Sequence, residues 1–466
     1  MPKLKWIPNI AGRTGPVYLA IADVIANDVA SGRLPVGARL PTHRALAGAL
    51  GVTIATITRA YAEAERRGLI DGTAGRGTFV RDRRRECSCG PDEAARAGRG
   101  FADLSRSFPL ELPGLGNHIE ELLTKIGTAR ISELVGPPPP FGRPEHREAG
   151  ARWMSHRIGA ADPARTAIVG GAQGGIMFAL TALTLPGDTV LAESLSHPCL
   201  RPVAQVTGTR IAGVEMDGEG MIPEALSEAC KRHSPKAVFV APTFQNPTGS
   251  LMPFQRREAI VAICRQHGVM IVEDDTNGLL DERSVPLSAL APERAIFLTA
   301  CAETLAGSVR IGFIHAPPAV MQRAAGITCL VASPTSSLAA ELAMHMIDSG
   351  GALRAAAWKR NVAEERRRLA LDKFPAGEAV AHPGAPQLWL RLSRPWSGDS
   401  FAAAARARGI GVAPASAFAI DLNLPKPDGV RIGLTVIEKD VDVPSALSTL
   451  ATLLGEDGAR SESLAA

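Results

Sequence analysis

Two sets of residues in this sequence could bind anions. One is the glycine-rich run GGAQGG at 170–175, which precedes an apolar stretch with helical periodicity. Because the first N–H groups of a helix lack partners within it, Ala172 and Gln173 would offer backbone donors to a phosphate. The other set combines arginine with hydroxyl side chains near the N-terminus, where Arg44, Thr53 and Arg59 stand. Arginine suits phosphate or guanine, and a threonine hydroxyl at a helix N-terminus reaches phosphate, so this set favours nucleic-acid binding.

Charge is distributed unevenly along the chain. Residues 1–90 hold 14 Lys and Arg against 7 Asp and Glu, a net charge of +7, whereas the whole chain carries +4. A basic N-terminal module on a mildly acidic body is typical of a protein that binds a polyanion through one end. A solvated basic face without a partner would give the same balance, so the charge alone leaves both interpretations open.

The elements that must position the basic residues have the order of a winged helix-turn-helix. Apolar residues recur at helical spacing over 15–31, and two short helices, each opened by a capping threonine, are expected over 42–50 and 53–67. The glycine-rich segment 68–80 has apolar ends, which is the pattern of a hairpin. The first 81 residues therefore predict one DNA-binding domain.

The rest of the chain predicts an α/β body. Short apolar runs alternate with amphipathic stretches, as in a mainly parallel sheet covered by helices. The runs expected to form strands are 189–192, 237–241, 270–272 and 295–299. The segment 82–100 is charged, small and without apolar periodicity, so we expect a flexible basic linker there. The predicted domains are thus 1–81, the linker 82–100, and 101–466.

Cysteine spacing and apolar runs restrict the class of protein. Of the 7 cysteines, only Cys87 and Cys89 are close in sequence, and no zinc-type spacing completes that pair, so no metal site is expected. The segment 1–10 lacks the apolar core of a signal peptide, and no run of about 18 apolar residues occurs. We therefore expect a cytoplasmic protein without a membrane partner.

The segment 31–80 resembles the GntR-type winged helix, through its helical framework and the wing sequence GRGTFV. In that family the second helix of the motif enters the major groove of double-stranded DNA, and the wing tip touches the minor groove. The resemblance implies this DNA-binding set: Arg44, Thr53, Thr56, Thr58, Arg59, Gly75 and Arg76. One position departs, because Ile54 follows Thr53 where the family usually has an arginine. If the family's arginine contacts a base, this chain lacks that contact, which is worth about 1–3 kcal/mol of discrimination between bases.

The body, roughly 100–455, resembles the fold-type I pyridoxal 5′-phosphate (PLP) enzymes of the aminotransferase kind. With the winged helix and the basic linker, this is the architecture of the MocR subfamily of GntR-type transcription regulators. The resemblance puts Asn246 at the phenolic oxygen of the cofactor, Asp274 at its pyridine nitrogen and Arg310 at its phosphate. Arg431 stands where an arginine binds the substrate α-carboxylate. The implied cofactor-binding set is Ala172, Gln173, His197, Asn246, Asp274, Glu303 and Arg310.

The catalytic position departs most from the family. The motif there is approximately Ser-x-Ser-Lys-Thr-Leu, and this chain has ACAETL at 300–305, so Glu303 occupies the lysine position with the spacing to Arg310 preserved. A carboxylate cannot condense with an aldehyde, so no covalent aldimine with PLP is expected, and catalysis is not expected. Further substitutions are Ala300 for a serine, Thr276 for a tyrosine, Pro137 for a tyrosine of a neighbouring subunit, and His197 for the stacking aromatic.

Together these residues predict a sequence-specific transcription regulator that forms a homodimer through its aminotransferase-like domain. A small amine, an amino acid or pyridoxamine 5′-phosphate would bind without a covalent bond, its amine beside Glu303 and its phosphate at Arg310 or its carboxylate at Arg431. Alternatively, these charges form internal ion pairs in a scaffold that binds no cofactor and only dimerises. Two other classes stay open: a PLP-dependent aminotransferase with an appended DNA-binding domain, and a structural protein that binds neither DNA nor ligand.

Overall fold

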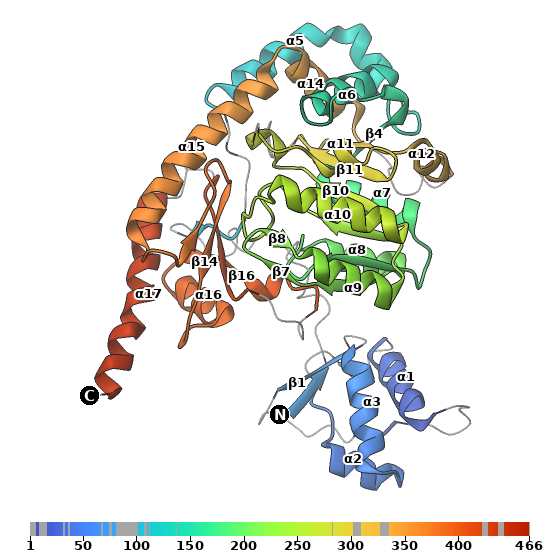
Figure 1. Cartoon of the computed structure of the whole chain (residues 1–466), viewed down its shortest axis with the longest axis vertical. Coiled ribbons are helices and arrows are strands. Elements are labelled where there is room, and N and C mark those ends of the chain that lie inside the picture. Colours follow the sequence, from blue (N-terminus) through green and yellow to red (C-terminus); the bar gives the residue numbers. More distant parts are fainter. Residues whose placement is uncertain are drawn as a thin grey trace. The chain divides into compact units, whose positions relative to one another are not determined.

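The computed structural model of the chain contains two compact units, residues 1–90 and 91–466 (Figure 1). The predicted linker 82–100 lies outside the described residues, so its conformation stays a prediction. The structure describes residues 6–8, 16–30, 33–35, 38–66, 69–73, 77–80, 101–106, 110, 112–136, 138–281, 283–301, 309–326, 335–421, 427–436 and 442–465.

The first unit has the predicted order of three helices and a hairpin. Its elements are α1 (Val17–Ala30), α2 (His43–Leu50), α3 (Ile54–Arg66), β1 (Ile70–Thr73) and β2 (Gly77–Val80). The Thr42 side chain caps α2 by accepting from the Ala45 N–H at 3.3 Å, and Gly51 ends α2 in the left-handed region, at φ 64°. A short turn therefore separates α2 from α3, as a helix-turn-helix requires.

The core of this unit joins its helices to its hairpin. Ile21 and Ile25 of α1 form one buried apolar cluster with Ile57 of α3 and Val80 of β2. The Tyr61 hydroxyl donates to the Pro41 carbonyl at 2.8 Å, which ties α3 to the segment before α2. This core holds α3 in place while leaving its other face exposed.

A seven-stranded sheet forms the centre of the second unit. The strand order is β4-β12-β11-β10-β9-β5-β6, and all strands except β12 run in the same direction. The mainly parallel sheet and its four expected strands are thereby confirmed. The strands are β4 (Thr166–Val169), β5 (Thr189–Glu193), β6 (Arg210–Val214), β9 (Ala237–Val240), β10 (Met270–Asp274), β11 (Ala295–Ala300) and β12 (Gly312–His315).

Helices cover both faces of this sheet. In β5, Val190 and Ala192 enter the apolar core shared with α7, α8 and α12, whereas Leu191 enters the core shared with α9, α10 and α11. Side chains alternate between the faces of a strand, so a strand buried on both sides must be apolar throughout. The covering helices are α7 (Gly171–Leu183), α8 (Leu200–Thr207), α9 (Pro223–His233), α10 (Phe254–His267), α11 (Leu287–Leu290) and α12 (Pro318–Ala325).

A smaller four-stranded sheet, in the order β13-β14-β17-β16, lies in the C-terminal part of the unit. The long helix α15 connects it to the rest of the unit (Figure 1): Ala352 near its start packs with α14, and Ala370 near its end packs beneath the small sheet. The remaining elements are β3 (Ala102–Asp103), α5 (Leu115–Leu134), α6 (Pro144–Ile158), β7 (Met216–Asp217), β8 (Gly220–Met221), α14 (Ser337–Asp348), α15 (Gly351–Lys373), β13 (Ala379–Val380), β14 (Gln387–Arg391), α16 (Gly398–Ala407), β15 (Ile410–Gly411), β16 (Ala413–Pro414), β17 (Gly429–Gly433) and α17 (Val443–Ala465).

No single helix in the described part of the chain is long and apolar enough to cross a membrane. The helices α2 and α3 pass the test of length and composition only as a pair, and they are bent by 115° at their junction.

Candidate ligand site and nucleic-acid interface

The predicted ligand residues of the second unit lie at one edge of the large sheet. Asp274 ends β10, Asn246 follows β9, and His197 follows β5. These three strands are parallel, so their carboxyl ends share an edge. Arg310 reaches the same edge from the start of the antiparallel strand β12, and Gln173 reaches it from the first turn of α7, which follows β4.

An arginine lies at the N-terminus of α7. The Arg310 side chain donates to Gln173 Oε1 at 3.2 Å, and both residues are exposed. Backbone contact brings their segments together, because a Cβ on Gly312 would lie 3.1 Å from Gly171 Cα, so a side chain there would not fit. A guanidinium beside the first N–H groups of a helix is an arrangement suited to a phosphate.

Asp274 is held by the turn that follows it. Its Oδ1 accepts from the Thr276 N–H at 3.1 Å and from the Thr276 hydroxyl at 2.5 Å, and the residue is 7% exposed. From sequence, Thr276 represented only the loss of a tyrosine. In the structure it orients the carboxylate instead, and this carboxylate could pair with a protonated ring nitrogen.

The charges of Asp274 and Arg431 both act on His197. Its Nδ1 accepts from the Cys199 N–H at 3.1 Å, which assigns the proton of the neutral ring to Nε2. Burial lowers the pKa of His197; Asp274 opposes that shift and Arg431 adds to it. The ring is therefore neutral at pH 7, and a neutral imidazole can stack on a flat ligand.

Arg431 of β17 joins the small sheet to the edge of the large one. One Nη donates to Asn246 Oδ1 at 2.6 Å and the other donates to the Ser105 carbonyl. The guanidinium also lies 4.8 Å from the centre of the Phe418 ring. These contacts fix a positive charge that is only 8% exposed, and a ligand carboxylate could replace the Asn246 or Ser105 acceptor.

A buried glutamine fixes the loop that carries Asn246. The Gln245 amide donates to the Leu195 carbonyl at 2.7 Å and to Glu193 Oε2 at 3.2 Å, while its Oε1 accepts from the Thr248 hydroxyl at 2.8 Å. Burial raises the pKa of Glu193 to about 8, so this carboxyl is mainly protonated at neutral pH. Gln245 and Glu193 were not predicted from sequence, because neither belongs to the motif positions.

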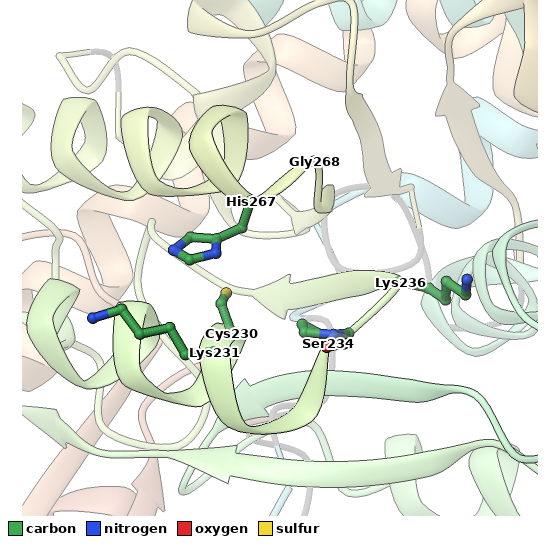
Figure 2. A pocket seen from close by; sticks show the side chains of 7 residues that line it. Cys230, Lys231, Ser234, Lys236, His267 and Gly268 are labelled. Atoms are coloured by element: carbon green, nitrogen blue, oxygen red, sulfur yellow. The ribbon is translucent and has the colours of Figure 1, made fainter.

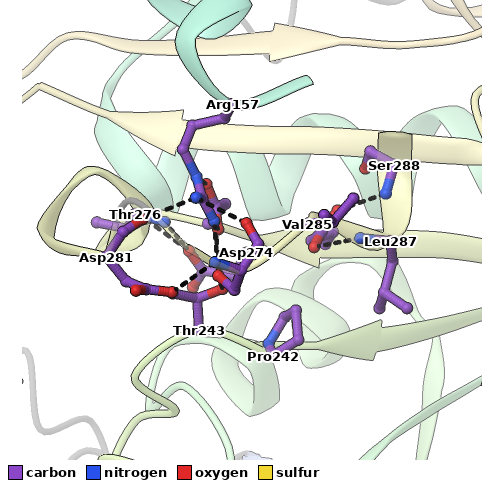
Figure 3. Close-up of polar contacts among 12 residues, drawn as sticks. Arg157, Pro242, Thr243, Asp274, Thr276, Asp281, Val285, Leu287 and Ser288 are labelled. Atoms are coloured by element: carbon purple, nitrogen blue, oxygen red, sulfur yellow. Dashed lines mark hydrogen bonds and ion pairs between the residues drawn. The ribbon is translucent and has the colours of Figure 1, made fainter. Parts of the chain in front are cut away.

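Behind the site, buried charges fix the segment after β10 (Figure 3). Arg157 of α6 makes a two-pronged ion pair with Asp275, at 2.8 and 3.1 Å. Glu273, next to it on the strand, accepts from the Leu287 and Ser288 N–H groups at 2.9 and 2.7 Å. The only sequence signal for this cluster was three consecutive acids at the end of an apolar strand.

The fully buried Arg257 completes this cluster. It donates to the carbonyls of Met252 and Pro242 and to the Thr243 hydroxyl, at 2.9, 2.8 and 3.1 Å. Because its donors are used by neighbouring backbone and side-chain oxygens, Arg257 supports the site without facing a ligand.

The remaining body positions are described only in part. Ala300 ends β11 and is 3% exposed, so no hydroxyl stands there to meet a phosphate. Glu303 and Pro137 lie outside the described residues. The sequence has no lysine between Lys236 and Lys359, so β9, β10, β11 and the segment after β11 supply no amine to the site.

In the first unit the structure places five of the seven predicted DNA-binding residues. Arg44 is exposed on α2. Thr53 accepts from the Thr56 N–H at 3.2 Å at the start of α3, and Thr58 donates to a carbonyl of its own helix. Arg59 lies 4.2 Å from the centre of the Tyr18 ring. The two wing residues, Gly75 and Arg76, lie outside the described residues.

A pocket elsewhere on the body is a separate feature (Figure 2). It lies where α9 and α10 end, at the amino ends of β9 and β10, which is the opposite edge of the sheet from Asp274. Its lining residues are Cys230, Lys231, Ser234, Pro235, Lys236, His267 and Gly268. The two lysines point away from each other, so they do not form one anion site. In the described part of the chain, no three His, Cys, Asp or Glu residues are grouped to hold a metal ion.

Both units match known protein families. The family described as "Aminotransferase class I and II" matches residues 115–443. The family described as "Bacterial regulatory proteins, gntR family" matches residues 17–80. The two resemblances inferred from motifs are thus confirmed at the level of the domains.

Relatives and solved structures agree with this division. A protein of Bacillus subtilis named "Uncharacterized HTH-type transcriptional regulator YdeF" is 26% identical over 334 residues, covering 67% of this chain and 68% of YdeF. The HTH-type pyridoxine biosynthesis transcriptional regulator PdxR of Corynebacterium glutamicum is 26% identical over 364 residues, covering 76% of this chain and 77% of PdxR. An archaeal alanine:glyoxylate aminotransferase has a TM-score of 0.72 at 24% identity, covering 85% of this chain and 99% of the enzyme. At that identity the likeness shows the fold alone.

The buried Glu193 gives the body a testable pH dependence. Between the pKa of an unfolded glutamate, about 4.3, and its folded value of about 8, the native state binds a proton that the unfolded chain lacks. Stability contributed by this group is therefore present at low pH and lost as the pH rises to about 8. We expect Glu193→Gln to flatten the fall in the urea midpoint between pH 5 and 8. Glu258→Gln, an exposed control on α10, should leave the slope unchanged; equal slopes in wild type and Glu193→Gln would contradict the assignment.

Proposed function

Because this chain belongs to the aminotransferase class I and II family and carries a GntR-type winged helix before that domain, the MocR architecture, we propose that it is a transcription regulator. It binds operator DNA in the cytoplasm as a homodimer held by the aminotransferase-like domains, and 82–100 serves as the flexible linker. One observation carries this proposal: a basic winged helix is fused to a body that has Glu303 at the lysine position. Residues 1–90, which include the winged helix, have a net charge of +7.

The DNA-binding half is supported by how the helix-turn-helix is built. The core fixes α3 by one face, and the other face is exposed at the N-terminal turns that an HTH places against base edges. Arg44 stands exposed on the preceding helix, where its forked donors could contact a phosphate. Regulators such as YdeF and PdxR, which match most of the chain, add support from similarity.

The body's residues fit a vitamin B6-type ligand held by charge alone. Arg310 at the start of α7 suits the phosphate, Asp274 suits the ring nitrogen, and the neutral His197 ring can stack. PLP, when bound, supplies an electron-accepting ring and an aldehyde that condenses with amines. Glu303 cannot condense with that aldehyde, but it can pair with an ammonium group. The fit therefore favours pyridoxamine 5′-phosphate or an amino acid as a non-covalent ligand.

Ligand binding could reach the DNA-binding half through the body's own conformation. Arg431 connects β17 of the small sheet to Asn246 and Ser105, and a carboxylate ligand would compete for those contacts. A ligand shifts a conformational equilibrium only by its differential affinity for the two states. Exchange of these contacts supplies such a difference, and we propose that it changes the spacing of the two winged helices in the dimer. In the alternative, the charged residues of the site form only internal ion pairs. The body then dimerises, and no ligand changes DNA binding.

The second candidate function is a PLP-dependent aminotransferase with an appended DNA-binding domain. The retained set of Asn246, Asp274, Arg310 and Arg431 and the fold favour it. It requires an amine to hold the cofactor and to move the α-proton, and Glu303 provides neither. Turnover of any amino donor by the wild-type chain would support this second function over the first.

Arg44→Ala should weaken DNA binding at every sequence. Loss of one phosphate contact per protomer should lower affinity and reduce the slope of log affinity against log salt by about one unit per contact. Fluorescence anisotropy with the DNA upstream of the gene, over a salt series, measures both quantities. Arg210→Ala, an exposed change on β6 of the body, is the matched control and should leave both unchanged. Identical curves for wild type and Arg44→Ala would contradict the assignment.

Glu303→Lys should restore covalent attachment of PLP. The rest of the site retains its charges, so a lysine there would need only to reach the aldehyde. Borohydride reduction followed by intact mass measurement should show one added cofactor in Glu303→Lys and none in the wild type. Glu365→Lys, an exposed change on α15, controls for adventitious modification. An added mass in the wild type would contradict the proposed loss of attachment, and none in Glu303→Lys would contradict the retained pocket.

A further inference from the structure

The exposed face of α3 is lined by methyl groups. Ile54, Ala55, Thr58 and Ala62 are all exposed and recur at the spacing of one helix face. We call these four residues the methyl stripe. Ile54 is 47% exposed, although α3 buries other apolar residues such as Ile57 completely. An isoleucine left open at the first turn of the helix therefore has no role in the core of the domain.

The polar groups at this end of α3 are occupied within the domain. Thr53 Oγ1 lies 2.9 Å from Thr56 Oγ1 and accepts from the Thr56 N–H. The Thr58 hydroxyl donates to the Ile54 carbonyl at 3.0 Å, so Thr58 offers a partner mainly its methyl group.

The first two turns of α3 contain a single cation. Residues 54–61 contain no asparagine, glutamine or lysine, and their single arginine, Arg59, lies 4.2 Å from the centre of the Tyr18 ring on α1. Arg59 is therefore the one side chain in these turns of the kinds that pair bidentately with guanine or adenine. The other exposed side chains at the start of this helix can contact bases only in other ways, through their methyl groups above all.

We propose that Ile54, with Ala55 and the Thr58 methyl, recognises the 5-methyl groups of thymines in the major groove. Thymine is the base that presents a methyl group there, and apolar side chains contact it. The N-terminal residues of a recognition helix are those that contact base edges, which is where Ile54 lies. The inference rests on the proposed DNA-binding function and adds its specificity: each half-site contains at least one thymine that Ile54 contacts.

The expected size of the effect follows from burial of one methyl group. Removing a buried methyl costs about 0.8 kcal/mol, which corresponds to about a fourfold change in affinity. Deoxyuridine pairs like thymidine but lacks the 5-methyl group, so replacing thymidine with deoxyuridine removes this contact and keeps the hydrogen-bonding edges.

The test uses the full chain and a randomised pool of DNA duplexes. After selection of bound duplexes, each thymidine of the preferred sequence is replaced singly by deoxyuridine, and dissociation constants are measured by anisotropy at fixed salt. The wild type should lose about fourfold in affinity at one or more positions per half-site. Ile54→Ala should bind thymidine and deoxyuridine duplexes equally at those positions. Ile7→Ala removes another exposed isoleucine of the same domain and should keep the wild-type ratio.

The outcomes separate this inference from the proposed function. Selective binding in which no deoxyuridine substitution lowers affinity overturns the thymine-methyl assignment but leaves DNA binding intact. The same holds if Ile54→Ala keeps the wild-type ratio, because Ile54 would then not make the contact. Failure to enrich any sequence overturns the proposed function, and this inference with it.

Discussion

The contact between Arg431 and Asn246 is the interaction on which the arrangement of the body depends. Arg431 belongs to β17 of the small sheet, and Asn246 belongs to the loop after β9 of the large sheet, so their 2.6 Å hydrogen bond crosses between the two. The second guanidinium arm reaches the Ser105 carbonyl, which adds the segment after β3 to the same junction. Arg431 is only 8% exposed and both of its Nη atoms bind protein oxygens, so a ligand carboxylate could enter by replacing one of these acceptors. The junction connects the two sheets, and it is the place where the proposed ligand would act.

Near the junction at Arg431, the site contains further charged residues, and each is positioned by a different element. Arg310 is held beside the start of α7, and Asp274 is oriented by Thr276. Behind Asp274, the ion pair between Arg157 and Asp275 fixes the segment that follows β10 (Figure 3). Each of these positions is held by contacts with other residues of the protein. A chain can therefore replace the lysine that holds a cofactor covalently and still keep the geometry that binds an anion, which is the combination proposed here.

The winged helix could be predicted from sequence because its helix starts and ends are determined by residues close together in the chain. Thr42 as a cap and Gly51 as a left-handed helix end act within a few residues, and the structure has both. The resemblance put Asn246 and Asp274 on one cofactor, and the structure brings both residues to the edge where the parallel strands have their carboxyl ends. The partners of Arg431 could not be predicted, since Ser105 lies 326 residues away and no periodicity encodes that pairing. The substitution of Thr276 for a tyrosine was evident from sequence, but its hydrogen bonds to Asp274 depend on the local turn and could not be predicted.

Calorimetric titration of the full chain with pyridoxamine 5′-phosphate tests the central claim most directly, because it measures binding that needs neither a covalent bond nor turnover. The account predicts saturable binding with recovery of the unmodified ligand, and a much weaker interaction in Arg310→Ala, which removes the phosphate partner. Arg323→Ala, on α12 and outside the site, should bind as the wild type does. No binding of pyridoxamine 5′-phosphate, PLP or amino acids would contradict the account and leave the body as a dimerisation scaffold.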